Sequence, residues 1–135
     1  MSQRHIARIV VMQTIFSIFH RPKIDRNEAL SYSISQMPRD LKKNDFPQML
    51  LEGIFRFEEQ IKNKIKEFSS DKSLEKIDPL TMAILYIGTF ELCFDESKQP
   101  PAVIINEAIE LAKEYGKDTS SSLVNAILSK MVVSK

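Results

Sequence analysis

The sequence predicts an all-α fold, and three observations carry that prediction. Apolar residues recur at steps of three and four along the chain, and no stretch of any length alternates with the period of two typical of a β-strand. Only 3 of the 135 residues are glycine. Start and stop signals divide the chain into about seven helical segments that short polar loops connect. A chain of this length buries roughly two thirds of its unfolded surface, which is enough for one hydrophobic core.

The first predicted helix covers about residues 3–19, and its second half is apolar on nearly every side. A helix without a polar face belongs in the centre of a fold. Its charged side chains stand only in the first two turns, at Arg4, His5 and Arg8. We therefore expect a buried helix whose basic amino-terminal end projects from the core.

Two further helices are predicted in the first half of the chain. One begins at Asp25, where Glu28 three positions later completes a capping-box pattern, and it ends before Pro38. The next is a single long helix over about residues 46–68, with charged residues filling the face opposite its apolar one.

A linker-like stretch over residues 69–73 separates two halves of similar length. No internal repeat relates these halves, so they are not duplicated units. We expect one domain over 1–135, built from an amino-terminal helical subdomain of about 1–68 and a carboxy-terminal helical subdomain of about 74–135.

The second half opens with a helix-start signal. Asp78 is suited to cap a helix, and Pro79 is suited to its first position. The helix that follows is nearly all apolar to about Phe94, which predicts the buried centre of this half.

Two more helices complete the predicted fold. One opens at Pro101 and ends at Gly116, which we expect as a left-handed carboxy-terminal cap. The last is capped by Thr119 or Ser120 and carries apolar residues at helical spacing.

The chain has a net charge of +1, but its charged residues are unevenly distributed along the sequence. Residues 1–26 carry +4, residues 27–73 sum to zero, residues 74–116 carry −5, and residues 117–135 carry +2. Such asymmetry is typical of a protein with charged partners, although solvated surface charge alone would also produce it. The single cysteine excludes a disulfide framework, and the chain lacks both a membrane-length apolar run and a secretory signal, so we expect a cytoplasmic protein.

The sequence gives little support for catalysis. His5 and His20 lack ligand partners at helical spacing on their own helix, and no glycine-rich phosphate loop is present. Glu107 and Glu110 lie three residues apart, which is more typical of a solvated, salt-bridged helix face than of an acid–base pair. We therefore expect no enzymatic activity, no cofactor and no metal.

Four blocks of the chain resemble the NusB transcription antitermination family. Residues 4–16, RHIARIVVMQTIF, resemble the family's amino-terminal signature, and residues 83–92, AILYIGTFEL, resemble its middle block. Residues 101–116, PAVIINEAIELAKEYG, together with the preceding Pro100, match the family pattern PxxVxINEAVELAKx[FY]G most fully, and residues 123–128, LVNAIL, resemble FVNGVL. The four blocks occur in family order and at nearly family spacing across almost the whole chain, which makes the resemblance specific.

The resemblance implies a NusB-like all-α fold of two packed three-helix bundles with a connecting helix. It implies a role in processive transcription of ribosomal RNA operons, in which the protein binds the boxA element of nascent RNA together with NusE, a ribosomal small-subunit protein. An RNA polymerase elongation complex with other Nus factors is the implied setting, and a homodimer is possible since some family members dimerise.

Candidate contact residues follow from the charge pattern and the resemblance. Guanidinium and imidazole groups on one helical end are suited to contact phosphates and to stack on RNA bases. The candidates for RNA binding are Gln3, Arg4, His5, Arg8, Ser122 and Leu123. The acidic segment is suited to attract a basic ribosomal protein, and its candidates are Glu75, Asp78, Glu91 and Glu107.

Four positions depart from the family pattern. Ile6 stands where members often carry arginine, Leu123 replaces a phenylalanine, Tyr86 replaces an arginine, and Ala126 replaces a glycine. The loss of an aromatic stacking face costs about 1–3 kcal/mol per base contact. These departures predict weaker intrinsic RNA affinity and a stronger dependence on the protein partner.

Alternatives remain open for several of these residues. Arg4 and Arg8 are alternatively members of surface salt bridges, and Asn106 and Asn125 are expected to be buried amides that satisfy backbone groups. For the whole chain, the alternative function is a non-catalytic helical scaffold or ribosome-assembly helper with little direct RNA recognition.

Overall fold

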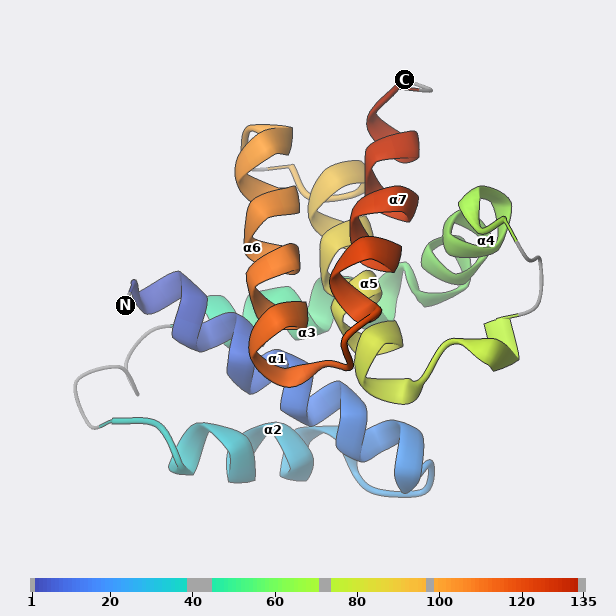
Figure 1. The fold of residues 1–135 in the computed structure, drawn as a ribbon. Coiled ribbons are helices and arrows are strands. Elements are labelled where there is room, and N and C mark those ends of the chain that lie inside the picture. Colours follow the sequence, from blue (N-terminus) through green and yellow to red (C-terminus); the bar gives the residue numbers. More distant parts are fainter. Residues whose placement is uncertain (1, 39–44, 71–73, 97–98, 134–135) are drawn as a thin grey trace.

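The computed structural model describes residues 2–38, 45–70, 74–96 and 99–133, and within them every element is helical. The bounds of the elements in chain order are α1 Gln3–His20, α2 Arg26–Ser35, α3 Phe46–Arg56, α4 Glu58–Phe68, a 3₁₀ turn Leu74–Lys76, α5 Pro79–Cys93, α6 Pro101–Tyr115 and α7 Ser120–Val133. Figure 1 shows α5, α6 and α7 standing side by side, with α1 and α2 crossing beneath them. The all-α prediction is confirmed.

The helix α1 is central to the amino-terminal half, as its apolar surface predicts. Ser2 caps it by accepting a hydrogen bond from the backbone N–H of His5 at 3.1 Å. The helix packs against α2, α3 and α5. Side chains that face these helices must therefore be apolar, or must be polar groups that pair with a group on the neighbouring helix. Ala7, Val11 and Met12 are accordingly buried.

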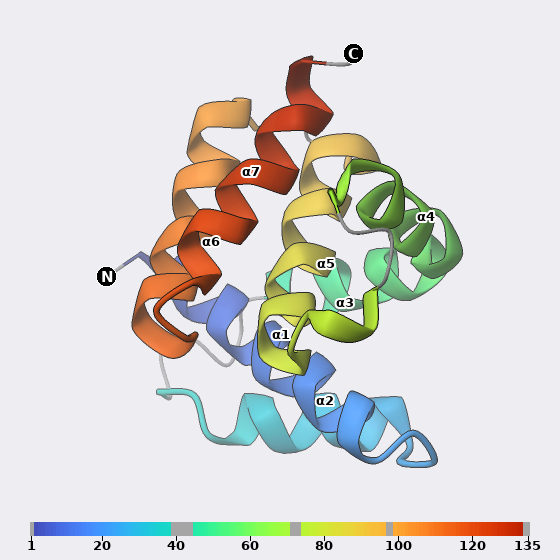
Figure 2. The ribbon, with the colours of Figure 1, turned by 45° about the vertical axis from the view of Figure 1, so that its right-hand side comes forward.

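The helix α5 is the centre of the whole fold. It begins where Asp78 accepts hydrogen bonds from the backbone N–H and the hydroxyl of Thr81, at 3.1 and 2.7 Å. All residues from 83 to 92 are buried, because α1, α3, α4, α6 and α7 all pack against this helix. Figure 2 shows α4 and α7 on different sides of α5. A single apolar cluster therefore draws on both halves of the chain.

The prediction of one long helix over residues 46–68 is wrong in one respect, because this segment forms two helices, α3 and α4. Phe57 leaves helical geometry at φ −105° and ψ 19° and separates α3 from α4. A straight helix of that length would span about 34 Å, whereas α5 spans about 22 Å. The turn at Phe57 lets both segments pack against α5, and it stacks the Phe57 ring on that of Phe94 at 5.0 Å. The predicted linker reaches beyond Ser70 into residues outside the described ranges.

The prediction for the end of α6 is also partly wrong. Gly116 does cap the helix, but at φ −91° and ψ −170° it is extended rather than left-handed. Glycine is required there by space, since an added Cβ would lie 2.7 Å from both the Ala112 carbonyl oxygen and the Ser120 Cβ. The close turn brings Ser120 into the core, where its hydroxyl lies 2.9 Å from that of Thr81 at the start of α5.

None of the described helices combines the length and apolarity that a membrane crossing would require.

The tight turn at Gly116 gives a test of the fold. Gly116→Ala should lower the free energy of unfolding by about 1–3 kcal/mol, because the new methyl group would lie 2.7 Å from both the backbone carbonyl oxygen of Ala112 and the Cβ of buried Ser120. Denaturant unfolding followed by circular dichroism measures the change. Asn106→Ala, at an exposed position on the same helix, is the control and should change stability by less than about 0.5 kcal/mol. Equal stabilities for the two variants would contradict the spatial requirement for glycine.

Candidate nucleic-acid interface

A buried ion pair joins α1 to α5. The Arg8 Nε donates to both carboxylate oxygens of Glu91 at 3.1 and 3.2 Å, and the Arg8 Nη2 lies 3.1 Å from Oε1. Nη2 also donates to the side-chain oxygen of Gln99 at 3.0 Å. Arg8 is 2% exposed and Glu91 is 5% exposed. Burial raises the pKa of the Glu91 carboxyl above its usual value, and the Arg8 guanidinium offsets only part of that rise.

A second basic side chain of α1, His5, lies between two carboxylates of α6. The His5 Nδ1 lies 2.8 Å from Glu107 Oε2, and its Nε2 lies 3.2 Å from Glu114 Oε1. Burial of the ring lowers the pKa of His5, but the hydrogen bonds and negative charges of Glu107 and Glu114 outweigh this effect and raise the pKa above 6.5. The physical cause of this rise is that a protonated imidazole can donate from both nitrogens to the two carboxylates.

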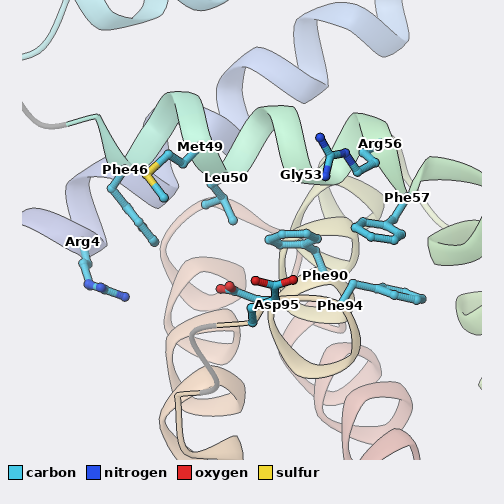
Figure 3. A pocket seen from close by; sticks show the side chains of 11 residues that line it. Arg4, Phe46, Met49, Leu50, Gly53, Arg56, Phe57, Phe90, Phe94 and Asp95 are labelled. Carbon is cyan, nitrogen blue, oxygen red and sulfur yellow. The ribbon is translucent and has the colours of Figure 1, made fainter.

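Arg4 differs from its two neighbours because it stays exposed. Its guanidinium carbon lies 4.6 Å from the centre of the Phe46 ring, in cation–π geometry. The side chain stands at the rim of a hollow of about 410 Å³ between α1, α3 and the end of α5. Figure 3 shows Arg4 at one end of this hollow and Arg56 at the other.

The wall of this hollow is largely aromatic. Phe57, Phe90 and Phe94 line it, and the first and last of these rings are stacked with an interplanar angle of 12°. Asp95 and Glu96 also line the hollow and supply negative charge. The hollow thus offers π-faces, two guanidinium groups and carboxylate acceptors within one concave surface.

The predicted RNA-binding residues divide into exposed and buried groups. Gln3, Arg4 and Ser122 are exposed, and Leu123 is half-buried against the core. The basic end was expected to project from the core, and this expectation is wrong for His5 and Arg8, whose charges are turned inward to acidic partners. The physical reason is that α5 and α6 carry carboxylates on the faces that contact α1.

The predicted partner-binding residues are similarly divided. Glu75 is exposed in the 3₁₀ turn, and Asp78 is half-buried as the cap of α5. Glu91 and Glu107 instead face α1, where they pair with Arg8 and His5. The structure therefore brings two of the four acidic candidates together with two of the basic candidates, whereas the sequence assigned them to separate surfaces.

Two of the four departures from the family pattern, Ile6 and Tyr86, have clear packing roles. Ile6 packs against a small cluster formed by Val10 and Met37. Tyr86 is buried and meets Phe19 edge to face at 5.2 Å, and burial together with nearby Glu58 raises the pKa of its hydroxyl. Ile6 and Tyr86 thus extend the core.

The expectation that Asn106 and Asn125 are buried amides is wrong, since both side chains are exposed. Asn125 accepts a hydrogen bond from Ser129 one turn later at 2.9 Å. Both asparagines lie on the outward faces of α6 and α7 rather than near backbone groups that lack partners.

Sequence reasoning missed Glu114 and Phe46. Glu114 lies seven residues after Glu107, so both carboxylates share one face of α6, and this spacing was a usable signal. No spacing rule links Phe46 to Arg4, because the contact joins separate helices.

Comparisons with known proteins agree on one family. The family model described as the NusB family matches residues 5–133. The chain is 34% identical to the transcription antitermination protein NusB of Syntrophus aciditrophicus over 128 residues, which cover 95% of this chain and 78% of that protein. It is also 34% identical to NusB of Acetivibrio thermocellus over 131 residues, 96% of this chain and 88% of the relative.

Solved structures share the fold. T. maritima NusB superposes with a TM-score of 0.84 at 27% identity, covering 98% of this chain and 92% of the other. A structure of antitermination factors NusB and NusE in complex with double-stranded RNA contains a chain with a TM-score of 0.85 at 18% identity, with 98% of each chain covered. At that identity the second likeness shows the fold alone.

The buried pair predicts strong coupling between Arg8 and Glu91. Arg8→Ala or Glu91→Ala alone should cost about 3–5 kcal/mol of unfolding free energy, because each leaves its partner charged and buried. The double variant should lose clearly less than the sum of the two single losses. A double-mutant cycle by denaturant unfolding measures the coupling.

The matched control for this cycle is the exposed pair of Arg26 and Glu58, whose charged atoms lie 3.2 Å apart. Its coupling energy should be about 0.2–1 kcal/mol, since solvent screens both charges. Equal coupling in the two cycles would contradict a special role for the buried pair.

The raised pKa of His5 predicts a fall in stability as the pH rises above 6.5. A histidine with a folded pKa above its unfolded value of 6.5 stabilises the protein fully below pH 6.5, and the contribution is lost as pH rises through the folded pKa. His5→Asn should flatten that part of the pH–stability curve, whereas the control His20→Asn should retain it. NMR titration of the two imidazole rings provides the direct check, and a His5 midpoint at or below 6.5 would refute the assignment.

Proposed function

The chain belongs to the NusB family, and from this premise we propose that it is an RNA-binding transcription antitermination factor. In this proposal it binds the boxA element of ribosomal RNA operons together with NusE and supports processive transcription of ribosomal RNA. The curated relatives carry the name transcription antitermination protein, which supports the same role for a chain that spans most of their length.

The exposed guanidinium of Arg4 is the observation that carries RNA binding. It lies over the Phe46 ring at the rim of the aromatic hollow, so its charge is accessible to a phosphate while its plane is oriented. Single-stranded RNA is held by such combinations of cations and π-faces. Gln3 beside it is exposed and offers an amide for a base edge or a sugar hydroxyl.

His5 and Arg8 take a different part in the proposed function. His5 is paired with Glu107 and Glu114, and Arg8 forms a buried pair with Glu91, so a direct phosphate contact would have to break an existing pair. We assign them as positioning residues that fix the first turns of α1. Ser122 and Leu123, at the start of α7, complete the proposed RNA-facing set.

NusE is the proposed protein partner, and an RNA polymerase elongation complex with other Nus factors is the proposed setting. Glu75 is the clearest acidic candidate for this contact, because it is exposed, belongs to the acidic segment and has no ion pair among the described residues. A basic protein surface would be attracted to it over a distance that depends on salt.

A helical scaffold with little RNA recognition is the second candidate. The burial of His5 and Arg8 favours it, since two of the four predicted polar or basic contacts on α1 point inward. The two candidates differ in salt dependence, because only phosphate contacts require affinity to fall steeply with salt.

The test measures the affinity of the protein for boxA RNA and for an unrelated RNA of equal length. Each affinity is measured with and without NusE at several salt concentrations. Arg4→Ala should weaken boxA binding and reduce the slope of log K against log salt by about 0.7, the value for one single-strand phosphate contact. Lys66→Ala, which removes an exposed charge from α4, is the control and should leave the slope unchanged.

NusE should strengthen binding of boxA more than binding of the unrelated RNA. A salt-independent affinity, or equal affinity for both RNAs in the presence of NusE, would overturn the RNA proposal and favour the scaffold.

A further inference from the structure

The contact between α1 and α6 gathers nitrogen and oxygen ligand atoms. One ring nitrogen of His5, one carboxylate oxygen of Glu107 and one of Glu110 all lie within 4.8 Å of one another. His5 is buried, Glu107 is half-buried and Glu110 is exposed, so the cluster opens to solvent on one side. We propose that these three residues form a binding site for a divalent transition-metal ion of the Zn²⁺ class.

The ligand types fit such an ion. Imidazole nitrogen and carboxylate oxygen bind zinc at about 2.0–2.2 Å, and three protein ligands with one open position form a known coordination pattern. Hard ions such as Mg²⁺ and Ca²⁺ prefer oxygen ligands alone, so the histidine selects against them. Glu110 has no hydrogen bond or ion pair among the described residues, which leaves its carboxylate available to an ion.

Glu114 supplies the supporting contact that a metal-bound histidine requires. Its Oε1 lies 3.2 Å from the His5 Nε2, while Nδ1 faces Glu107 at 2.8 Å. A proton on Nε2 donated to Glu114 would leave the Nδ1 lone pair directed toward Glu107. Metal-binding histidines nearly always donate their other N–H to a carboxylate, carbonyl or water in this way, which fixes the tautomer and the ring orientation.

The helices hold these groups rigidly. Positions 107, 110 and 114 lie at steps of three and four, so the three carboxylates share one face of α6. His5 approaches from α1, and Arg8, the nearest competing cation at 3.8 Å from Glu107, is directed mainly to Glu91. Three carboxylates around one imidazole leave negative charge that a divalent ion would neutralise.

Binding would tie the first turn of α1 to α6 and stabilise the contact that positions Arg4. The site itself does not depend on RNA recognition. Metal affinity is measured without RNA, so failure of one proposal leaves the other standing.

The experiment uses the full chain, freed of metal with a chelator and then titrated with ZnCl₂ by isothermal calorimetry. The expected result is one saturable ion per chain and a rise in melting temperature on binding. Glu110→Gln should lower the affinity at least tenfold, and Glu114→Gln should lower it by about 10–100-fold through the histidine. His20→Asn removes the other histidine of the chain and should bind zinc as the parent does.

A direct readout locates the ion. Titration with Co²⁺ should shift and broaden the NMR signals of the His5 ring and leave those of the His20 ring sharp. Glu110→Gln keeps the proposal testable even if His5→Asn fails to fold, since Glu110 is exposed. Absence of saturable binding, parental affinity in Glu110→Gln, or loss of binding in His20→Asn would each overturn the site.

Discussion

The buried pair of Arg8 and Glu91 is the interaction on which the arrangement of this fold depends. Burying two charges is costly, and the cost is recovered only when each is fully hydrogen-bonded by the other and by neighbours. Arg8 meets that condition through Glu91 and Gln99. Because the two charged groups belong to α1 and α5, the requirement for pairing fixes how the central helices of the two halves lie against each other. Non-directional apolar packing alone would leave this register less defined.

The same contact between α1 and α5, together with the one between α1 and α6, reduces the charge that the oppositely charged segments present to solvent. The basic amino-terminal end and the acidic carboxy-terminal half partly neutralise each other inside the structure, through Arg8 with Glu91 and His5 with Glu107. The charge left for partners is therefore smaller than the segment totals indicate. Arg4 is therefore the basic residue of this helix end whose charge faces solvent, whereas His5 and Arg8 are buried against acidic partners.

Polar groups inside the fold are paired rather than excluded. Within the described ranges every buried side-chain nitrogen and oxygen has a hydrogen-bond partner. The Thr14 hydroxyl donates to that of Ser33 at 2.8 Å and joins α1 to α2, and the hydroxyls of Thr81 and Ser120 join the first turns of α5 and α7. These bonds link specific turns of different helices, and the carboxylates around His5 extend the same principle to the molecular surface. The nitrogen and oxygen atoms gathered there come from residues 102 positions apart in the chain, His5 and Glu107.

The sequence by itself determined the helices and the family. Helical spacing placed the two nearly all-apolar helices at the centre, Asp25 and Asp78 marked true helix starts, and four ordered motif blocks identified the family. Each of these features depends on residues that are close together in the sequence, so it can be recognised without the tertiary structure. The tertiary structure alone decided the break at Phe57, the conformation of Gly116, and which charges face solvent. Each depends on what another helix places opposite the residue. An arginine on an exposed turn and an arginine opposite Glu91 look the same in sequence, and only packing separates Arg4 from Arg8.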